Sequence, residues 1–291
     1  MRLDQALDQA LDLYVEQLRA DGRSEHTVRQ YRRHVRLLAA WFGGAKHVED
    51  VTHEDLARFL NSDRARHRPD GKGKKATSTN ALRSSLRTFF AYAHAAGLTQ
   101  QNAARLVRRA RCAPPPPRGL SRDEQERLLD VLGAAQGEEA ERDRVLFEVM
   151  LSTGIRIGSC LALDVGDVDL NRGELYLRTT KGDRPFVIYF NQRIAALLVG
   201  LIGDRAEGAL FESRHRRRLS ARQVARRLDL WLERAGCRQA SPHALRHSFG
   251  QGLYDSTRDP FLVRAALGHR SIASTLVYAR VIGADLRRAL A

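Results

Sequence analysis

Four consecutive prolines, Pro114 to Pro117, interrupt this chain of 291 residues. Proline cannot continue a helix, and a run of prolines adopts a stiff, extended conformation. The segment "RCAPPPPRGLSRDE" therefore predicts a domain boundary. We expect one domain over residues 1–113, a proline-rich linker over 114–120 and a second domain over 121–291. The chain is long enough for two ordinary domains, each with its own core.

The first domain has the pattern of a small helical bundle. The stretch "LDQALDLYVEQLRADG" repeats apolar residues at helical spacing and ends at Gly22. Ser24 is suited to cap the next helix, and Thr52 with Asp55 forms a capping-box pattern for a third. The polar segment "RHRPDGKGKKATST" is typical of a disordered loop, and the amphipathic stretch "NALRSSLRTFFAYAHAAG" after it predicts another helix.

The second domain combines helices with one hairpin. Ser121 and Glu124 form a second capping-box pattern, and "EQERLLDVL" and "RDRVLFEVMLSTG" after it read as helices. Residues 173–190, "GELYLRTTKGDRPFVIYF", alternate in hydrophobicity and turn at "KGD", which predicts two antiparallel strands. The expected fold is mainly α with a small antiparallel β-sheet.

The charge balance favours a polyanionic partner. Lys and Arg number 49 against 34 Asp and Glu, a formal charge of +15 and a pI near 10.6. The longest apolar run, residues 195–203, is too short to span a bilayer, and the acidic N-terminal stretch is unlike a signal peptide. We expect a cytoplasmic protein with no membrane partner. Cys112, Cys160 and Cys237 are widely separated, which indicates neither a disulfide framework nor a cysteine zinc site.

Nucleotide and metal motifs are absent from the sequence. There is no GxxxxGK[ST] or GxGxxG, and Ala244 stands where an HExxH motif would have its glutamate. Asp164 and Asp167 lack a third carboxylate at a matching spacing, so we interpret them as solvated turn residues rather than as magnesium ligands. No cofactor is expected.

Cationic side chains gather in "HALRHSF", which places His243, Arg246 and His247 within five positions. Three such groups repel one another unless an anion, a metal or open solvent accompanies them. In "TGIRIGSCLAL", Arg156 is expected at the start of a helical turn, where a positive charge is unfavourable. An anion bound near Arg156 would explain its position.

Three further residues complete a set suited to phosphodiester chemistry. Lys181 is expected at the hairpin tip, His269 follows a helix-ending Gly268, and Tyr278 lies nine residues later. Singly, each has an ordinary interpretation as a turn lysine, a helix cap or a core tyrosine. Together with the arginines and histidines they provide donors for the charge of a phosphate transition state, a general acid and an intrinsic nucleophile.

Four segments in order, "TGIRIGSCLALDVGDVDL", "TTKGDRPFVIYF", "HALRHSF" and "LGHRSIASTLVYAR", resemble the catalytic boxes of the tyrosine recombinase (phage integrase, Xer-type) family. The helical first domain resembles that family's core-binding (SAM-like) domain and the second its catalytic domain. The resemblance implies site-specific DNA recombination, used for integration, excision or resolution. Strands would be cleaved and rejoined through a 3′-phosphotyrosyl intermediate and a Holliday junction, without ATP or metal.

The resemblance also implies roles for the residues that match its boxes. Arg156 and Arg246 would bind the scissile phosphate, and His269 would donate a hydrogen bond to it. Lys181 would be the general acid for the departing 5′-oxygen, and Tyr278 would be the nucleophile.

Two histidines of the cluster have less direct roles, and one position differs from the family's usual pattern. His243 would assist proton transfer from the tyrosine, whereas His247 is expected to support helix packing or a neighbouring catalytic group. The family commonly has an acidic residue three positions after the first arginine, where this chain has Ser159. We still expect an active enzyme, with slower or differently regulated turnover.

The expected partner is double-stranded DNA with an inverted-repeat site, bound by a homotetramer, with a second recombinase or accessory protein as a further candidate. The basic run 213–227 is interpreted as DNA-contacting, with a solvated surface as the alternative. The predicted DNA-binding residues are Arg29, Arg32, Arg33, Arg36, Arg83, Arg87, Arg214, Arg216, Arg217 and Arg222.

Three other functions compete with recombination. A DNA-relaxing enzyme of the type IB topoisomerase kind would use a similar constellation. A metal-dependent hydrolase would use His243, His247 and His269, since HxxxH is a metal-ligand spacing on one helix face, although the adjacent Arg246 disfavours a cation there. A catalytically silent DNA-binding repressor would have no need of Tyr278.

Overall fold

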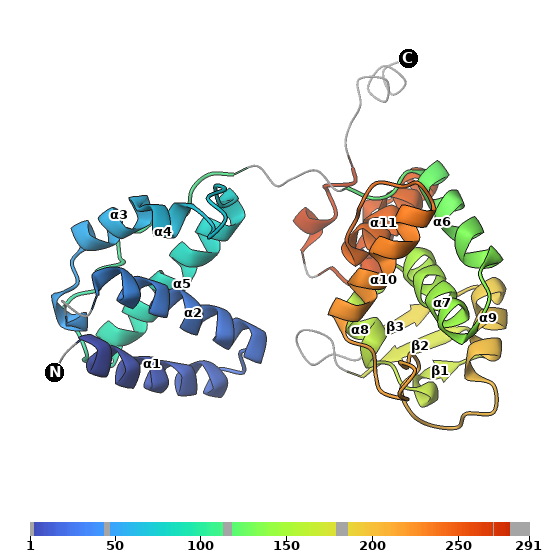
Figure 1. Cartoon of the computed structure of the whole chain (residues 1–291), viewed down its shortest axis with the longest axis horizontal. Helices are drawn as coiled ribbons and strands as arrows, with labels where there is room; N and C mark the ends of the chain where they lie inside the picture. Colours follow the sequence, from blue (N-terminus) through green and yellow to red (C-terminus); the bar gives the residue numbers. More distant parts are fainter. Residues whose placement is uncertain (1–2, 44–46, 113–117, 179–185, 270, 280–291) are drawn as a thin grey trace, which may run out of the picture. The chain divides into compact units, whose positions relative to one another are not determined.

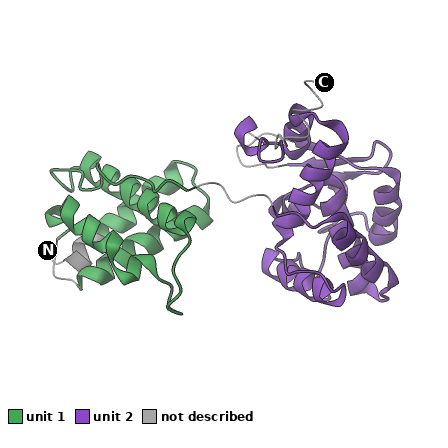
Figure 2. Cartoon of the chain, turned by 90° about the horizontal axis from the view of Figure 1, so that it is seen from above, with its two compact units in different colours: residues 1–114 green, residues 115–291 purple. Residues whose placement is uncertain are grey.

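The structure, a computed structural model, describes residues 3–43, 47–112, 118–178, 186–269 and 271–279. The chain divides into two compact units, residues 1–114 and 115–291 (Figure 2). Helices dominate both units, and the described residues contain one small antiparallel sheet, in unit 2 (Figure 1). The expected fold class is confirmed.

Unit 1 is a helical bundle whose helices begin where the sequence predicts caps. The side chain of Ser24 accepts a hydrogen bond from the Thr27 amide, and Thr52 and Asp55 form a complete capping box. Its elements are α1 (Leu3–Ala20), α2 (Glu25–Phe42), the 3₁₀ turn η1 (Val48–Asp50), α3 (His53–Asn61), α4 (Asp63–Arg66) and α5 (Ala76–Ala95).

The core of unit 1 lies between α1, α2 and α5, which pack against one another. Tyr14 of α1 contacts Phe89 and Tyr92 of α5 through its ring. The apolar stripe of α2 is buried at Val28, Val35 and Leu38. This burial leaves the arginines of α2 outside the core.

The polar segment before α5 differs from its prediction. Instead of a disordered loop it forms a tight turn in which His67 pairs with Gly73 in an antiparallel bridge. The Lys74 amide donates to the Arg66 carbonyl at 2.7 Å. The chain turns at Gly71, which has a φ of +76°. Main-chain pairing between the residues on both sides of this glycine orders a segment whose composition alone indicates disorder.

Unit 2 packs its helices around one buried helix. Its helices are α6 (Arg122–Ala134), α7 (Glu138–Thr153), α8 (Ile157–Ala162), α9 (Gln192–Ile202), α10 (Ala221–Arg234), α11 (Pro242–Thr257) and α12 (Pro260–Leu267), with 3₁₀ turns η2 (Val165–Asp167) and η3 (Ile272–Ser274). The predicted capping box at Ser121 and Glu124 opens α6. Helix α7 packs against α6, α9 and α11, and Val145, Leu146, Phe147, Val149 and Met150 fill its sides. Arg142, Asp143 and Glu148 of the same helix are also buried and form ion pairs, so α7 is a core helix that carries both apolar side chains and paired charges.

The sheet contains the predicted hairpin and one extra short strand. Its order is β1 (Val168–Asp169), β2 (Glu174–Leu177) and β3 (Phe186–Tyr189), all antiparallel. Leu175 pairs with Ile188, and both side chains enter the core. The tip of the hairpin, residues 179–185, lies outside the described residues.

The interpretation of Asp164 and Asp167 as solvated turn residues is wrong. They form a capping box around η2, and Asp167 is only 5% exposed. The guanidinium of Arg178 lies 2.5 Å from Asp167 and 3.2 Å from Asp164, and Arg218 also pairs with Asp164. These carboxylates fix the base of the hairpin, an arrangement that requires arginines from distant positions.

Residues just after the prolines are attached to unit 2. The Leu120 amide donates to the Ser248 hydroxyl of α11 at 2.8 Å, and a Cβ on Gly119 would lie 2.9 Å from the Ser248 nitrogen. Arg238 donates to the Gly119 carbonyl and pairs with Glu124. In the described part of the chain, no helix is both long and apolar enough to cross a membrane.

Candidate active site

Arg156 is positioned by the end of α7. Gly154 ends that helix in a left-handed conformation with φ +63°, and a Cβ there would meet the ring of Phe249 at 2.4 Å, so a glycine is required. The chain then turns at once, and Arg156 becomes the N-cap of α8. Its guanidinium lies 3.5 Å from the carbonyl oxygen of Gly268.

Helix α11 carries His243, Arg246 and His247, with Pro242 at its first turn. Arg246 is 3% exposed and donates to the carbonyl oxygens of Gly154 at 2.6 Å and Leu267 at 2.5 Å. Since Arg156 points to Gly268 and Arg246 to Leu267, the two guanidinium groups meet at the end of α12.

His269 and Tyr278 lie on the segment that follows α12. Gly268 ends that helix with φ +57°, as the sequence predicts for a helix-ending glycine. His269 Nδ1 lies 2.9 Å from the hydroxyl of Thr275, which is fully buried. Tyr278 packs in a small apolar cluster with Val263 and Leu267 and is 3% exposed.

The nucleophile candidate contacts a histidine directly. The Tyr278 hydroxyl lies 2.8 Å from His247 Nδ1, and the ring of His247 in turn meets the ring of His243 edge-on, with centroids 4.5 Å apart. His247 was expected to support packing or a neighbouring group, and the structure places it against the tyrosine that we assign as nucleophile. The hydroxyl is bonded to His247 rather than to His243.

Burial and mutual repulsion shape the electrostatics of this cluster. Burial, with a contribution from Arg156, lowers the pKa of Arg246 to about 10, so the guanidinium stays charged at neutral pH. Burial and the neighbouring cations lower the pKa of both His247 and His269 to about 4 and also lower that of His243. Burial raises the pKa of the Tyr278 hydroxyl, an effect that Arg246 opposes. The histidines are therefore neutral, and the cluster carries net positive charge.

The structure thus brings together five of the six predicted catalytic residues. Lys181 is the sixth, and it lies outside the described residues. Ser159, where an acidic residue was expected by resemblance, is on α8 and half-buried. Among the described residues, no three His, Cys, Asp or Glu side chains are grouped to hold a metal ion. The residues brought together are Arg156, His243, Arg246, His269 and Tyr278.

The predicted DNA-binding arginines lie on the surfaces of both units. In unit 1, Arg33 and Arg87 are exposed and Arg83 is half-buried, while Arg32 forms an ion pair with Asp12 at 3.0 Å and Arg29 donates to the Glu25 carbonyl. Arg36 is also exposed. In unit 2, Arg214, Arg216, Arg217 and Arg222 are exposed, and Arg216 lies 3.7 Å from Glu212.

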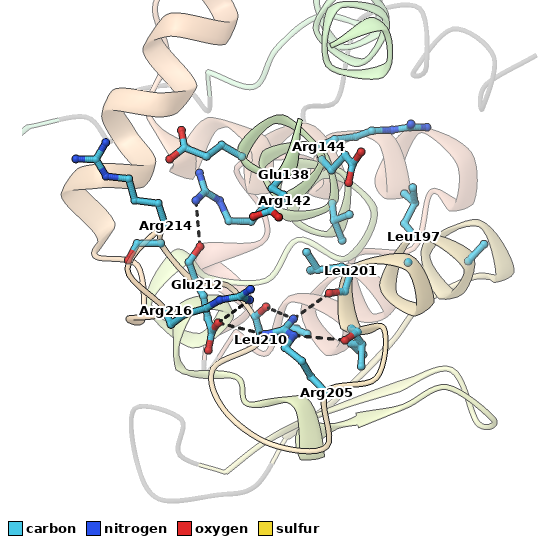
Figure 3. A pocket seen from close by; sticks show the side chains of 17 residues that line it. Glu138, Arg142, Arg144, Leu197, Leu201, Arg205, Leu210, Glu212, Arg214 and Arg216 are labelled. Carbon is cyan, nitrogen blue, oxygen red and sulfur yellow. Dashed lines mark hydrogen bonds and ion pairs between the residues drawn. The ribbon is translucent and has the colours of Figure 1, made fainter. Parts of the chain in front are cut away.

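A cavity of about 550 Å³ in unit 2 is lined by none of the five predicted catalytic residues that the structure describes. It lies between α7, α9 and the loop before α10, with Leu197 and Leu201 on its apolar wall (Figure 3). Its arginines already have partners: Arg142 donates to the Glu212 carbonyl, and Arg205 donates to carbonyl oxygens at the end of α9 and in the loop after it. The cavity therefore offers few unpaired donors to a ligand.

Sequence reasoning missed two residues that shape the site. Thr275 orients His269, and Gly250 of α11 leaves room for the Tyr278 ring, whose Cζ would lie 2.8 Å from a Cβ at that position. The signal for Gly250 is a glycine inside a helix, an unfavourable choice unless something approaches closely.

Two family models match separate parts of the chain. Residues 118–283 match the phage integrase family, and residues 11–97 match the N-terminal SAM-like domain of phage integrases. A tyrosine recombinase XerC of Chromobacterium violaceum is 32% identical over 277 residues, which are 94% of this chain and 90% of that protein. The chain belongs to the phage integrase family of tyrosine recombinases. It is a site-specific recombinase that acts on DNA.

Solved structures share the tyrosine recombinase fold. The XerH site-specific recombinase bound to a palindromic difH substrate, in a post-cleavage complex, has a TM-score of 0.75 with 20% identity, over 98% of this chain and 86% of that one. A lambda integrase dimer bound to a COC′ core site has a TM-score of 0.72 with 22% identity, over 92% of this chain and 96% of that one.

Proposed function

We propose that Tyr278 cleaves DNA through a 3′-phosphotyrosyl intermediate at a phosphate bound by Arg156 and Arg246. The observation that carries this proposal is the meeting of both guanidinium groups at Leu267 and Gly268, with His269 next in the chain. The hydrogen-bond partners of both guanidinium groups there are neutral carbonyl oxygens. A phosphate supplies the missing negative charge, and fixed donors stabilise the extra charge of its transition state.

The remaining roles follow from the chemistry of strand transfer. His243 assists removal of the tyrosine proton, and His269 donates to a phosphate oxygen once the phosphate is bound. Lys181 on the hairpin protonates the departing 5′-oxygen. The broken phosphodiester's energy is kept in the phosphotyrosine, so rejoining needs no ATP, and we propose that no metal cofactor takes part.

DNA binding and assembly form a second layer of the proposal. Residues 1–113, the core-binding domain, and residues 121–291, the catalytic domain, both contact DNA phosphates through their surface arginines. Four copies act on two inverted-repeat sites through a Holliday junction, with or without a second recombinase or accessory protein. The palindromic site of the XerH complex and the dimer of the lambda integrase complex support this arrangement. The cytoplasm, where a DNA substrate would be met, is the proposed compartment.

Trapping of the covalent adduct tests the chemistry. A nicked suicide duplex incubated with the protein in EDTA should give an adduct that survives SDS gel electrophoresis. Tyr278→Phe should abolish the adduct, whereas Tyr254→Phe, on α11 beside Arg258, should not. An adduct that persists in Tyr278→Phe would remove the proposal.

The general-acid role has its own test. Lys181→Ala should slow cleavage of ordinary DNA, and a 5′-bridging phosphorothiolate should restore the rate because a thiolate leaves without protonation. An equal defect on both substrates would deny Lys181 that role.

The phosphate contacts are tested by the salt dependence of DNA binding. A log–log plot of DNA affinity against salt concentration should fall steeply, and a flat plot would contradict the phosphate contacts.

A further inference from the structure

Two residues of α11 contact Tyr278, the proposed nucleophile. The Tyr278 hydroxyl lies 2.8 Å from His247 Nδ1, and the tyrosine is 3% exposed. The phenol ring lies among Val263 and Leu267 of α12, so solvent and substrate have little access to it.

Gly250 makes this placement possible. A Cβ at position 250 would lie 2.8 Å from Tyr278 Cζ and 3.0 Å from its hydroxyl oxygen, closer than side chains pack. The backbone of Gly250 does not have a positive φ, so the helix itself does not require glycine there. Since glycine disfavours a helix interior, the close approach of the tyrosine is the structural reason for it.

The Tyr278 hydroxyl is hydrogen-bonded to His247 and not to His243, the residue that we propose assists removal of its proton. His243, His247 and Gly250 follow one another at the i, i+4 and i+7 spacing and lie on one face of α11. The tyrosine contacts the second and third of them. The hydroxyl is hydrogen-bonded to His247 Nδ1, and the ring of His243 contacts the ring of His247, with centroids 4.5 Å apart.

We propose that His247 is a positioning residue that, with Gly250, forms a resting pocket for Tyr278, and that the hydroxyl leaves this pocket before it attacks the phosphate. The inference rests on the proposed function, because it assumes that Tyr278 is the nucleophile.

The protonation states agree with a resting contact. The pKa of His247 is lowered to about 4, and that of Tyr278 is raised by burial. The imidazole is therefore a weak base and the phenol a weak acid in this arrangement. The pair shares a neutral hydrogen bond, and the proton stays on the tyrosine.

Two substitutions open the pocket by different means. Gly250→Ala expels the ring sterically, and its matched control is Gly252→Ala, on the same helix, where a Cβ meets nothing within 4 Å. His247→Phe removes the hydrogen bond but keeps a ring against His243, and its control is His247→Asn, whose amide can take the place of Nδ1. Alanine favours helix formation over glycine, so both alanine variants should fold.

The first readout is the tyrosine itself, without DNA. In protein labelled with 3-fluorotyrosine, the ¹⁹F resonance that disappears in Tyr278→Phe reports on residue 278. This resonance should shift in Gly250→Ala and in His247→Phe, and it should stay in place in Gly252→Ala. Of the two His247 variants, His247→Asn should shift it less. An unchanged resonance in His247→Phe would overturn the proposal whether or not the enzyme is active.

The second readout is single-turnover cleavage of saturating suicide DNA. Gly250→Ala and His247→Phe should form adduct about fivefold faster than wild type, the factor that corresponds to one neutral hydrogen bond of ~1 kcal/mol. Slower cleavage in both variants, with a shifted resonance, would show that the contact belongs to the attacking geometry and would also overturn the proposal. If wild type forms no adduct, the proposed function fails, and the resonance still decides whether the pocket exists.

Discussion

Unit 2 contains two groups of arginines that differ in how their charge is balanced. In the first, the fully buried carboxylate of Asp143 accepts hydrogen bonds from Arg142 at 2.6 Å and Trp231 at 2.8 Å, and Arg227 pairs with the same carboxylate. In the second, the guanidinium groups of Arg156 and Arg246 meet at carbonyl oxygens near the end of α12.

The difference separates arginines that stabilise the fold from arginines that, as we propose, bind a phosphate. A buried cation that has a carboxylate partner is part of a closed network, and losing the partner is costly. Carbonyl dipoles satisfy donors but do not neutralise charge, so burial, and after it repulsion by Arg156, lowers the pKa of Arg246. An incoming phosphate would complete the second group, whereas the first has no need of one.

The largest effect should come from breaking the first group. Asp143→Asn keeps the shape of the side chain but leaves Arg142 and Arg227 without their shared carboxylate. We expect the free energy of unfolding to fall by about 3–5 kcal/mol. Denaturant unfolding measures this loss, and Glu139→Gln, which removes the half-exposed second partner of Arg227, should cost less than ~1 kcal/mol. Equal losses in the two variants would contradict the distinction between the groups.

The second group should respond in the opposite way. Arg156→Gln removes a charge that repels Arg246, so the unfolding free energy should stay within ~0.5 kcal/mol of wild type. Cleavage of suicide DNA should nevertheless slow by about 100- to 1000-fold, the usual loss when one donor to a transition-state oxygen is removed. Arg222→Gln, an exposed arginine on α10, is the control and should weaken DNA binding without slowing the chemical step. A strongly destabilised Arg156→Gln with normal cleavage would reverse the assignment.

The sequence predicted the parts of the fold that are encoded locally. Capping boxes at Thr52 and Ser121 and the cap at Ser24 are found as expected, because a side chain and an amide three residues apart decide them. The helix-ending Gly268 and the strands of the hairpin are also found. The order of the four boxes indicated the family, which the comparisons show.

Contacts between distant residues were not predictable in the same way. Asp164 and Asp167 looked like solvated turn residues because their partners, Arg178 and Arg218, become neighbours only in the folded chain. The bond between His247 and Tyr278 joins positions 31 residues apart. The turn before α5 looked disordered because its order comes from main-chain pairing, which composition does not reveal.

An inorganic anion should detect the unbalanced group directly. At ten times its dissociation constant, sulfate bound between Arg156 and Arg246 would raise the unfolding free energy by about 1.4 kcal/mol. Sulfate also stabilises proteins in general, so the informative quantity is the difference between wild type and Arg156→Gln in thermal unfolding. Identical sulfate dependence in the two proteins would mean that the anion does not bind there.

A smaller effect should appear as a dependence on pH. His247 and His269 have pKa values of about 4 in the folded chain, below the usual value of 6.5. Between these values the unfolded chain binds protons that the folded one does not, so stability is complete above about pH 6.5 and decreases as the pH falls towards 4. Both side chains are half-buried, so solvent screening keeps the effect modest.

The measurement compares wild type with His269→Gln, because burial also lowers the pKa of His34 in unit 1 and both proteins share that contribution. The free energy of unfolding is measured for both proteins at about pH 7 and pH 5.5. His26→Gln, at an exposed histidine, is the control. His269→Gln should lose less stability on acidification than wild type, and bound DNA should weaken the dependence because phosphate favours the protonated histidines. If the two proteins lose the same stability, burial and the cations of the site do not lower the pKa of His269 in the folded chain.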